Sequence, residues 1–364
     1  MKMKAASQPA LAIGAYDPFH RGPHPAGVRT VSAVDTARRR SFPCELWYPA
    51  AAQHAGQDIE PRTQDCFSVP GRDRSRRQMA VRDAVAKPGS HPLVLFSHPS
   101  GYHRRAATFL CTHLASHGYV VGALDHSELV APELARREGE TSQQRAARAD
   151  AWIASRVPDM RFLLDYLLQR VSGQSGIELD PARIGIVGHS FGGWTALATT
   201  AIERRIRAVV ALAPAGSSHP KPGILPVKLT FEWGRDVPTL YLVGESDIVT
   251  PLDGMNELFE RTRATKRMLI LRRADHSHFM DDIEREHELV RQMPFTSELS
   301  WISKEMRPIA ELCSEAHAQL FVRGLTVWHL DATLKGAEPA QRLSQGNLQA
   351  MLKELGVAAI VHPS

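Results

Sequence analysis

The chain has 364 residues, of which 43% are hydrophobic and 23% are charged, and it carries a formal net charge of +5. This composition is that of an ordinary globular protein with enough apolar residues for a sizeable core. The basic residues are scattered and lack the interleaved aromatic side chains of a nucleic-acid-binding surface, so we expect no nucleic-acid partner.

Cysteine spacing and apolar runs bear on the cellular location. Four cysteines lie far apart and form no C-x-x-C pair: Cys44, Cys66, Cys111 and Cys313. This spacing fits neither a zinc site nor a disulfide framework, so we expect reduced thiols in a cytoplasmic protein. Residues 1–4 resemble the start of a signal peptide, but the apolar stretch that follows is too short for one. We expect no transmembrane segment, because no apolar run approaches the roughly 18 residues needed to span a bilayer.

The predicted elements alternate between strands and helices after an irregular first part. Strands are expected at residues 28–37 and 41–48, and residues 50–90 are expected to form a long loop. Continuous apolar runs then predict buried strands at 92–96, 119–124, 184–187, 208–212, 239–243 and 267–271. Helical patterns lie between several of these runs, at 104–117, 156–171, 192–204 and 252–264. The alternation predicts an α/β protein with a mostly parallel central sheet and helices on both faces.

Three further segments complete a single domain that we expect to span residues 1–364. Residues 127–155 are polar and charged and interrupt the alternation, which predicts an inserted helical cap or lid. Residues 214–236 contain four prolines and three glycines, which predicts an irregular insertion. Residues 294–364 are expected to form a helical C-terminal extension.

The central motif is Gly188-His189-Ser190-Phe191-Gly192-Gly193. It directly follows a predicted strand and opens a predicted helix, which is the setting of a nucleophile elbow. Side chains near Ser190 would clash in so tight a turn, which explains the glycines two positions to either side. The turn presents the serine hydroxyl at the N-terminus of a helix, where free N–H groups face a developing anion. Ser190 is therefore the predicted nucleophile.

A serine nucleophile needs a base, and in this arrangement the acid and the histidine follow the serine in chain order. Asp247 is the predicted acid because it lies just past the end of a predicted strand; Glu245 is the alternative. His276 lies after the last predicted strand and is the predicted base, with His278 as the alternative. The His-x-His pattern lacks a third ligand in a recognised spacing, so we expect no metal.

An oxyanion hole needs two N–H donors. One is expected from Phe191, the residue after the nucleophile. The other is expected from the segment Phe96 to His103, which follows an earlier predicted strand. Pro99 has no N–H to donate, and Ser100 is the predicted donor.

These residues resemble a known family. The segment Ser97-His98-Pro99-Ser100-Gly101, the motif around Ser190 and the pair Asp247 and His276 resemble the α/β hydrolases. Over residues 28–290 the chain is similar to the plasma-type platelet-activating-factor acetylhydrolases and the dienelactone-hydrolase-like group. The resemblance implies hydrolysis of carboxylic esters, often with short acyl groups and without a cofactor.

The chain departs from these relatives at three points. Pro99 stands where the loop usually has glycine. In the plasma acetylhydrolases the acid follows the strand after the nucleophile helix, but here residues 211–214 contain no carboxylate. Dienelactone hydrolases proper use a cysteine where this chain has Ser190, which argues against that activity.

The resulting hypothesis is a serine-dependent ester hydrolase with a Ser-His-Asp triad and an acyl-enzyme intermediate. We expect a small-molecule ester substrate, short-acyl or lipid-like, and no cofactor. An amidase or peptidase with the same triad, a slow-turnover ligand-binding receptor and transfer of the acyl group to an alcohol are the alternatives.

Overall fold

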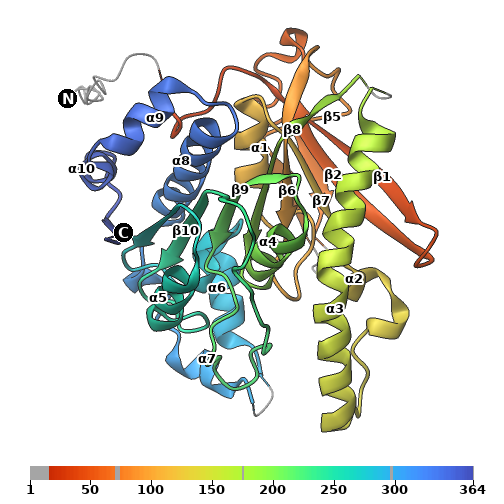
Figure 1. Cartoon of the computed structure of the whole chain (residues 1–364), viewed down its shortest axis with the longest axis vertical. Coiled ribbons are helices and arrows are strands. Elements are labelled where there is room, and N and C mark those ends of the chain that lie inside the picture. The colour runs from red at the N-terminus through yellow and green to blue at the C-terminus, as the bar shows by residue number, and fades with distance from the viewer. Residues whose placement is uncertain (1–15, 70–73, 174–175, 296–297, 364) are drawn as a thin grey trace.

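The computed structural model of the chain is built around one large sheet (Figure 1). The structure describes residues 16–69, 74–173, 176–295 and 298–363. Residues 1–15, which include the signal-peptide-like stretch, lie outside the described residues. Ten of the described strands form the sheet in the order β12-β11-β10-β9-β8-β6-β7-β2-β1-β5.

The central strands of the sheet are parallel, as the alternating pattern predicted. They are β6 (Ser90–Ser97), β7 (Val120–Leu124), β8 (Glu178–His189), β9 (Ile206–Leu212), β10 (Thr239–Gly244) and β11 (Lys266–Leu271). The edges are mixed: β1 (Ala26–Asp35) and β2 (Arg40–Pro49) pair antiparallel, and β12 (Ala359–Val361) pairs antiparallel with β11. All parallel strands end on the same side of the molecule, which brings the loops after them together.

Helices cover both faces of this sheet, because alternate residues of the strands point to opposite sides. In β6, Val94 belongs to one apolar cluster and Leu93 and Leu95 to the other. The first cluster lies against α1 (Thr108–Ser116) and α8 (Glu315–Thr333). The second lies against α3 (Ser142–Tyr166), α4 (Phe191–Ile202) and α5 (Leu252–Arg261). The expected α/β arrangement, a mostly parallel sheet covered by helices on both faces, is confirmed.

The smaller helices lie around this framework. α6 (Ile283–Gln292) and α7 (Ser300–Glu305) pack on each other, and α9 (Glu338–Gln345) packs on α8. α10 (Leu348–Glu354) leads into β12, so the C-terminal residues add a strand to the sheet edge. Residues 213–238 contain neither helix nor strand.

The polar segment after β7 merges with the next helix. It begins with α2 (Ser127–Val130) and a 3-10 turn, and its second half is the N-terminal half of α3. The sequence pattern suggested a separate helix from residue 156, but α3 is continuous from Ser142 through Pro158, and a π-turn extends it over residues 167–171. A capping box of Thr141 and Gln144 starts the helix. In Figure 1 the N-terminal half of α3 extends beyond the sheet, with α2 beside it.

Residues 50–90 contain short strands that the sequence did not predict. β3 (Asp65–Ser68) and β4 (Ser75–Gln78) form a separate two-stranded sheet, and β5 (Val81–Arg82) pairs with β1. These strands have two to four residues and are largely polar, so they carry no usable hydrophobic period. No helix in the described part of the chain is long and apolar enough to cross a membrane.

Candidate active site

Ser190 occupies the sharp turn between β8 and α4. Its backbone has φ 57° and ψ −118°, a conformation that residues with a side chain rarely adopt. Three hydrogen bonds hold it there. Its N–H donates to the Leu212 carbonyl at 2.9 Å, and its own carbonyl accepts from the N–H groups of Trp194 and Ala215 at 3.0 and 2.9 Å.

The flanking glycines allow the backbone to approach itself closely at this turn. A Cβ at Gly188 would lie 2.0 Å from the Gly192 carbonyl oxygen, and one at Gly192 would lie 2.0 Å from the Ser97 carbonyl oxygen. Any side chain at these two positions would therefore displace backbone atoms rather than a movable neighbour. The contact between Gly192 and Ser97 also places the end of β6 against the start of α4.

Ser190, His276 and Asp247 form a hydrogen-bonded chain at the ends of three strands. Ser190 Oγ lies 2.8 Å from His276 Nε2, and His276 Nδ1 lies 2.7 Å from Asp247 Oδ2. Asp247 is buried, whereas Ser190 and His276 are partly exposed. A partly exposed hydroxyl with a histidine on one side can meet a substrate and pass on its proton.

Asp247 is held by its own loop as well as by the histidine. Its Oδ1 accepts hydrogen bonds from the N–H groups of Val249 and Thr250 at 2.8 and 2.9 Å. Its Oδ2 accepts one from the Thr250 hydroxyl at 2.8 Å. The carboxylate therefore has a fixed orientation, with one oxygen aimed at His276.

The environment of His276 favours its charged form. Burial alone lowers the pKa of an imidazole, but the adjacent Asp247 carboxylate outweighs burial and raises the pKa of His276 above its ordinary value of 6.5. A carboxylate in this position stabilises the imidazolium form of His276.

His278 and Glu245, the alternatives to His276 and Asp247, interact with other groups. His278 is buried, with Nδ1 2.7 Å from Asp275 Oδ1 and Nε2 3.1 Å from the Cys313 carbonyl. Asp275 also contacts His287 Nδ1 at 2.7 Å. Burial opposes the charge, but the Asp275 carboxylate prevails and raises the pKa of His278 to about 10. Glu245 pairs with Arg272 at 3.0 Å. The structure brings neither residue to Ser190.

Both segments predicted to supply oxyanion donors lie beside the elbow. Phe191 is the first residue of α4, and the first N–H groups of a helix have no partner within it. Ser100 lies in the turn after β6, where the Tyr102 N–H donates to the Pro99 carbonyl at 3.3 Å. Gly101 in this turn has φ 76°.

A second Ser-His-Asp chain was not anticipated from the sequence. Ser97 Oγ lies 2.9 Å from His126 Nε2, and His126 Nδ1 lies 3.1 Å from Asp159 Oδ2. All three residues are 0% exposed, so this chain cannot meet a substrate and instead ties the end of β6 to α3. His126 lies two residues after the end of the predicted strand 119–124, a position that could have drawn attention to it.

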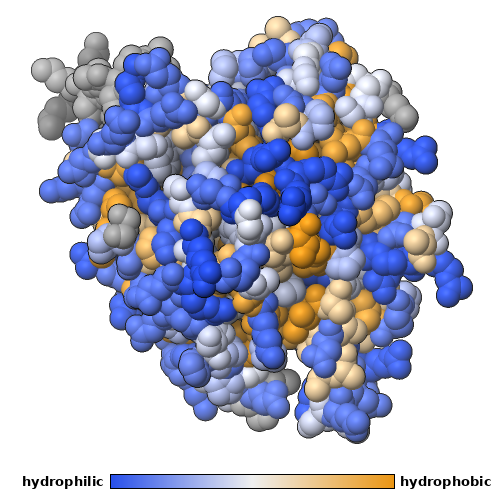
Figure 2. Space-filling model, viewed as in Figure 1, coloured by the Kyte–Doolittle hydropathy of each residue, from blue (hydrophilic) through white to orange (hydrophobic). Residues whose placement is uncertain are grey.

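An apolar cluster lies next to Ser190. Its buried members come from the segment after β7, α3, α4 and the irregular segment after β9: Ala131, Leu134, Trp152, Phe191, Trp194, Ala215 and Val227. The rings of Phe191 and Trp194 stack with centroids 5.3 Å apart. Figure 2 shows apolar surface along the inner side of α3.

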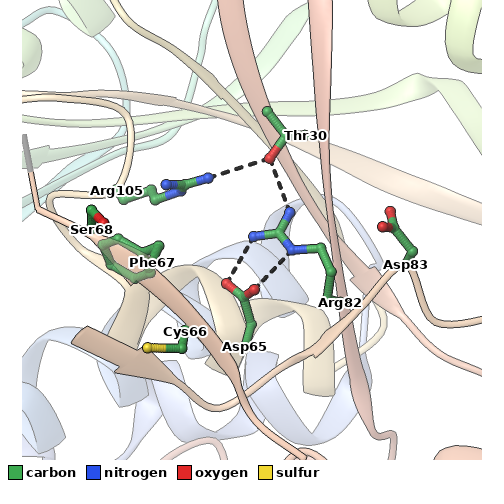
Figure 3. A pocket seen from close by; sticks show the side chains of 8 residues that line it. All are labelled: Thr30, Asp65, Cys66, Phe67, Ser68, Arg82, Asp83 and Arg105. Atoms are coloured by element: carbon green, nitrogen blue, oxygen red, sulfur yellow. Dashed lines mark hydrogen bonds and ion pairs between the residues drawn. The ribbon is translucent and has the colours of Figure 1, made fainter. Parts of the chain in front are cut away.

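A polar cavity lies elsewhere on the molecule. It measures about 520 Å³ and is lined by residues of β1, β3 and β5, by Asp83 after β5 and by Arg105 in the turn before α1 (Figure 3). Arg82 pairs there with Asp65 at 2.8 Å and with Glu45 at 3.0 Å, and Arg105 pairs with Glu45 at 2.8 Å. It contains none of the predicted site residues, and its charges neutralise one another. Within the described ranges, no three His, Cys, Asp or Glu side chains are grouped to hold a metal ion.

Comparison with known proteins finds esterases and acetylhydrolases. A family model described as Chlorophyllase matches residues 75–235. The platelet-activating factor acetylhydrolase of Cavia porcellus is 24% identical over 241 residues, covering 56% of this chain and 51% of that protein. The acetylhydrolase of Gallus gallus is 25% identical over 217 residues, covering 46% and 51%. The chain thus spans about half the length of these curated relatives.

A solved structure resembles the chain over nearly its whole length. The ferulic acid esterase from Streptomyces cinnamoneus aligns with a TM-score of 0.63 and 24% identity, covering 94% of this chain and 97% of the esterase. At this identity the likeness shows the fold alone, which is the α/β-hydrolase fold that the sequence predicted. Together the comparisons confirm the predicted resemblance and support a serine hydrolase of this group.

Proposed function

We propose that this chain, which has the α/β-hydrolase fold, is a serine-dependent carboxylic ester hydrolase with Ser190 as nucleophile, His276 as base and Asp247 as acid. The observation that carries the proposal is the hydrogen-bonded chain of these three residues at the turn between β8 and α4. The likeness to acetylhydrolases and to an esterase adds support.

In the proposed reaction, His276 takes the proton of Ser190 while Oγ attacks the ester carbonyl. Asp247 holds the imidazole with Nδ1–H toward the carboxylate and stabilises its positive charge. The N–H groups of Phe191 and Ser100 bind the oxyanion of the tetrahedral intermediate. The imidazolium then protonates the leaving alcohol, and an activated water releases the acid from the acyl-enzyme.

We propose that the substrates are short-acyl or lipid-like esters, and the packing beside Ser190 favours a short acyl group. The apolar cluster around Phe191 and Trp194 fills the space beside the nucleophile with packed side chains. A long acyl chain would have to displace them, and forcing extra methylenes into a packed site costs about 1–3 kcal/mol.

Hydrolysis of p-nitrophenyl esters from acetate to palmitate tests this assignment. We expect kcat/KM for acetate or butyrate to exceed that for palmitate by about tenfold or more, since each 1.4 kcal/mol is a factor of ten. Methyl ferulate and matched p-nitroanilides extend the series. Preference for the ferulate would change the acyl class from aliphatic to aromatic, and preference for the anilides would indicate an amidase. Binding without turnover would indicate a receptor.

The pH dependence of ester hydrolysis should follow His276. The free histidine must be neutral to act as base, and its pKa is raised above 6.5, so kcat/KM should fall as pH decreases with a midpoint above 6.5. In Asp247→Asn the pKa of His276 itself, followed by NMR of the imidazole, should be lower than in the wild type, because the Asp247 charge that raises it is gone. Far-UV circular dichroism over the same range checks that the protein stays folded. A wild-type midpoint at or below 6.5 would contradict the prediction.

The proposal includes action in the cytoplasm. It rests on the four widely spaced cysteines, which are free thiols in the structure. Cys44, Cys111 and Cys313 are buried, as is common for reduced cysteine in a protein core.

A further inference from the structure

We propose that Arg156 is a positioning residue of the oxyanion hole, which holds the turn after β6 and the start of α4 in the geometry that the reaction needs. The inference rests on the proposed function and adds a residue that is remote in sequence from every motif described above. Arg156 lies in the middle of α3 and is 0% exposed.

Arg156 contacts both segments that carry the proposed donors. Its Nη1 donates to the His98 carbonyl oxygen at 2.6 Å. The centre of its guanidinium lies 4.2 Å from the centroid of the Phe191 ring, in a cation–π arrangement. One rigid, planar group thus braces the residue before Pro99 and the residue after the nucleophile.

Because Arg156 holds the His98 carbonyl, the Ser100 N–H has little freedom to change its direction. The peptide bond between His98 and Pro99 is planar, and the proline ring fixes φ of Pro99. One torsion, ψ of Pro99, then remains between the carbonyl held by Arg156 and the peptide plane that contains the Ser100 N–H. The Pro99 carbonyl lies in that same plane, so any contact that holds this carbonyl also orients the N–H.

Hydrogen bonds from the turn itself fix this last torsion. The Pro99 carbonyl accepts from His98 Nδ1 at 2.8 Å and from the Tyr102 N–H at 3.3 Å. His98 Nε2 in turn accepts from the His126 N–H at 3.2 Å, which requires a neutral ring with its proton on Nδ1. Burial lowers the pKa of His98 well below its ordinary value, in agreement with this assignment. Proline therefore suits position 99, where hydrogen bonds fix the carbonyls of both His98 and Pro99.

A buried carboxylate balances the charge of Arg156. Nη2 of Arg156 pairs with Oε1 of Glu128 in α2, and Glu128 is only 8% exposed. A buried cation without such a partner would be strongly unfavourable. The pair therefore also joins α2 to α3 through the same arginine that contacts the turn after β6.

The test uses variants of Arg156 in the full chain. Arg156→Met should lower kcat for p-nitrophenyl acetate about 100-fold, as loss of an oxyanion donor does, with KM changed less than about threefold. Arg156→Lys keeps the charge but lacks the planar fork and should lower kcat about tenfold. If Arg156→Met alone does not fold, the double variant Arg156→Met with Glu128→Leu removes the whole pair without leaving a buried charge.

A tetrahedral inhibitor separates positioning from general stability. A trifluoromethyl ketone adds to Ser190 and forms an oxyanion, so its Ki should rise in parallel with the loss of kcat. The Ki of a simple alcohol, which forms no oxyanion, should stay within about threefold. The matched control is Arg235→Met, which removes an arginine that donates to the carbonyls of Thr200 and Glu203 at the other end of α4. It should lower Tm and leave kcat and both inhibition constants within about threefold.

The outcomes distinguish this inference from the proposed function. Ser190→Ala is measured alongside. If Ser190→Ala is inactive while the Arg156 variants keep full kcat and full ketone affinity, the role of Arg156 is overturned and the proposed function stands. Equal losses in Arg156→Met and Arg235→Met would also overturn it. Full turnover by Ser190→Ala would overturn the proposed function, and the inference with it.

Discussion

Replacement of Ser190 by alanine is expected to lower kcat for p-nitrophenyl acetate on the order of 10⁶-fold, the loss seen when a serine nucleophile is removed from such a chain. The variant keeps the backbone bonds of the turn, because the N–H and carbonyl of residue 190 make them. KM should change little, since the hydroxyl contributes to bond formation rather than to binding of the ester.

The control for this experiment is alanine at Ser97, the other serine in a Ser-His-Asp chain. Ser97 is 0% exposed and bonds to His126, so its loss should affect stability and leave most turnover. A fluorophosphonate probe should label the wild type and Ser97→Ala but not Ser190→Ala. Undiminished ester turnover by Ser190→Ala would rule out the mechanism.

Asp247→Asn should lower kcat about 10⁴-fold while the fold is retained. The asparagine oxygen can still accept from the N–H groups of Val249 and Thr250, so its NH₂ group must face His276. That NH₂ forces the proton of the imidazole onto Nε2, where the ring can no longer take a proton from Ser190.

A change at Thr250 separates this tautomer effect from disturbance of the loop. Thr250→Val removes the hydroxyl that donates to Asp247 and leaves the carboxylate in place, so we expect kcat to fall less than about tenfold. The Tm of both variants is read in parallel. An Asp247→Asn enzyme with kcat within tenfold of wild type would show that Glu245 or another group supplies the acid.

The parts of the fold that could be predicted from the sequence are those with a local residue pattern. The parallel strands from β6 to β11 each contain a continuous apolar run, and each proposed catalytic residue lies in the turn or loop after one of these strands. Strand ends meet at one edge of a parallel sheet, so the approach of Ser190, Asp247 and His276 follows from topology. Their catalytic roles stay predictions.

Other features depend on contacts between distant segments. Arg156, His126 and Asp159 belong to no motif, and their importance comes from packing of α3 over the end of β6. The short edge strands β5 and β12 pair through backbone atoms. They have two and three residues, too few to show the alternation of apolar and polar residues that predicts a strand. The sequence predicted a cap at residues 127–155 and a separate helix from residue 156, whereas α3 runs unbroken across this boundary.

The continuity of α3 limits how this protein can be diversified. A cap between two strands looks like a module that evolution or an engineer could exchange for a new substrate range. The segment predicted from sequence, residues 127–155, would carry Glu128 away and leave Arg156 behind, because the cut falls between Ser155 and Arg156 in the middle of one helix. Such a chimera would contain an unpaired buried cation, at a cost of about 3–5 kcal/mol. New specificities should therefore arise by point changes on the apolar face of α3, or by exchanges that transfer Glu128 and Arg156 together.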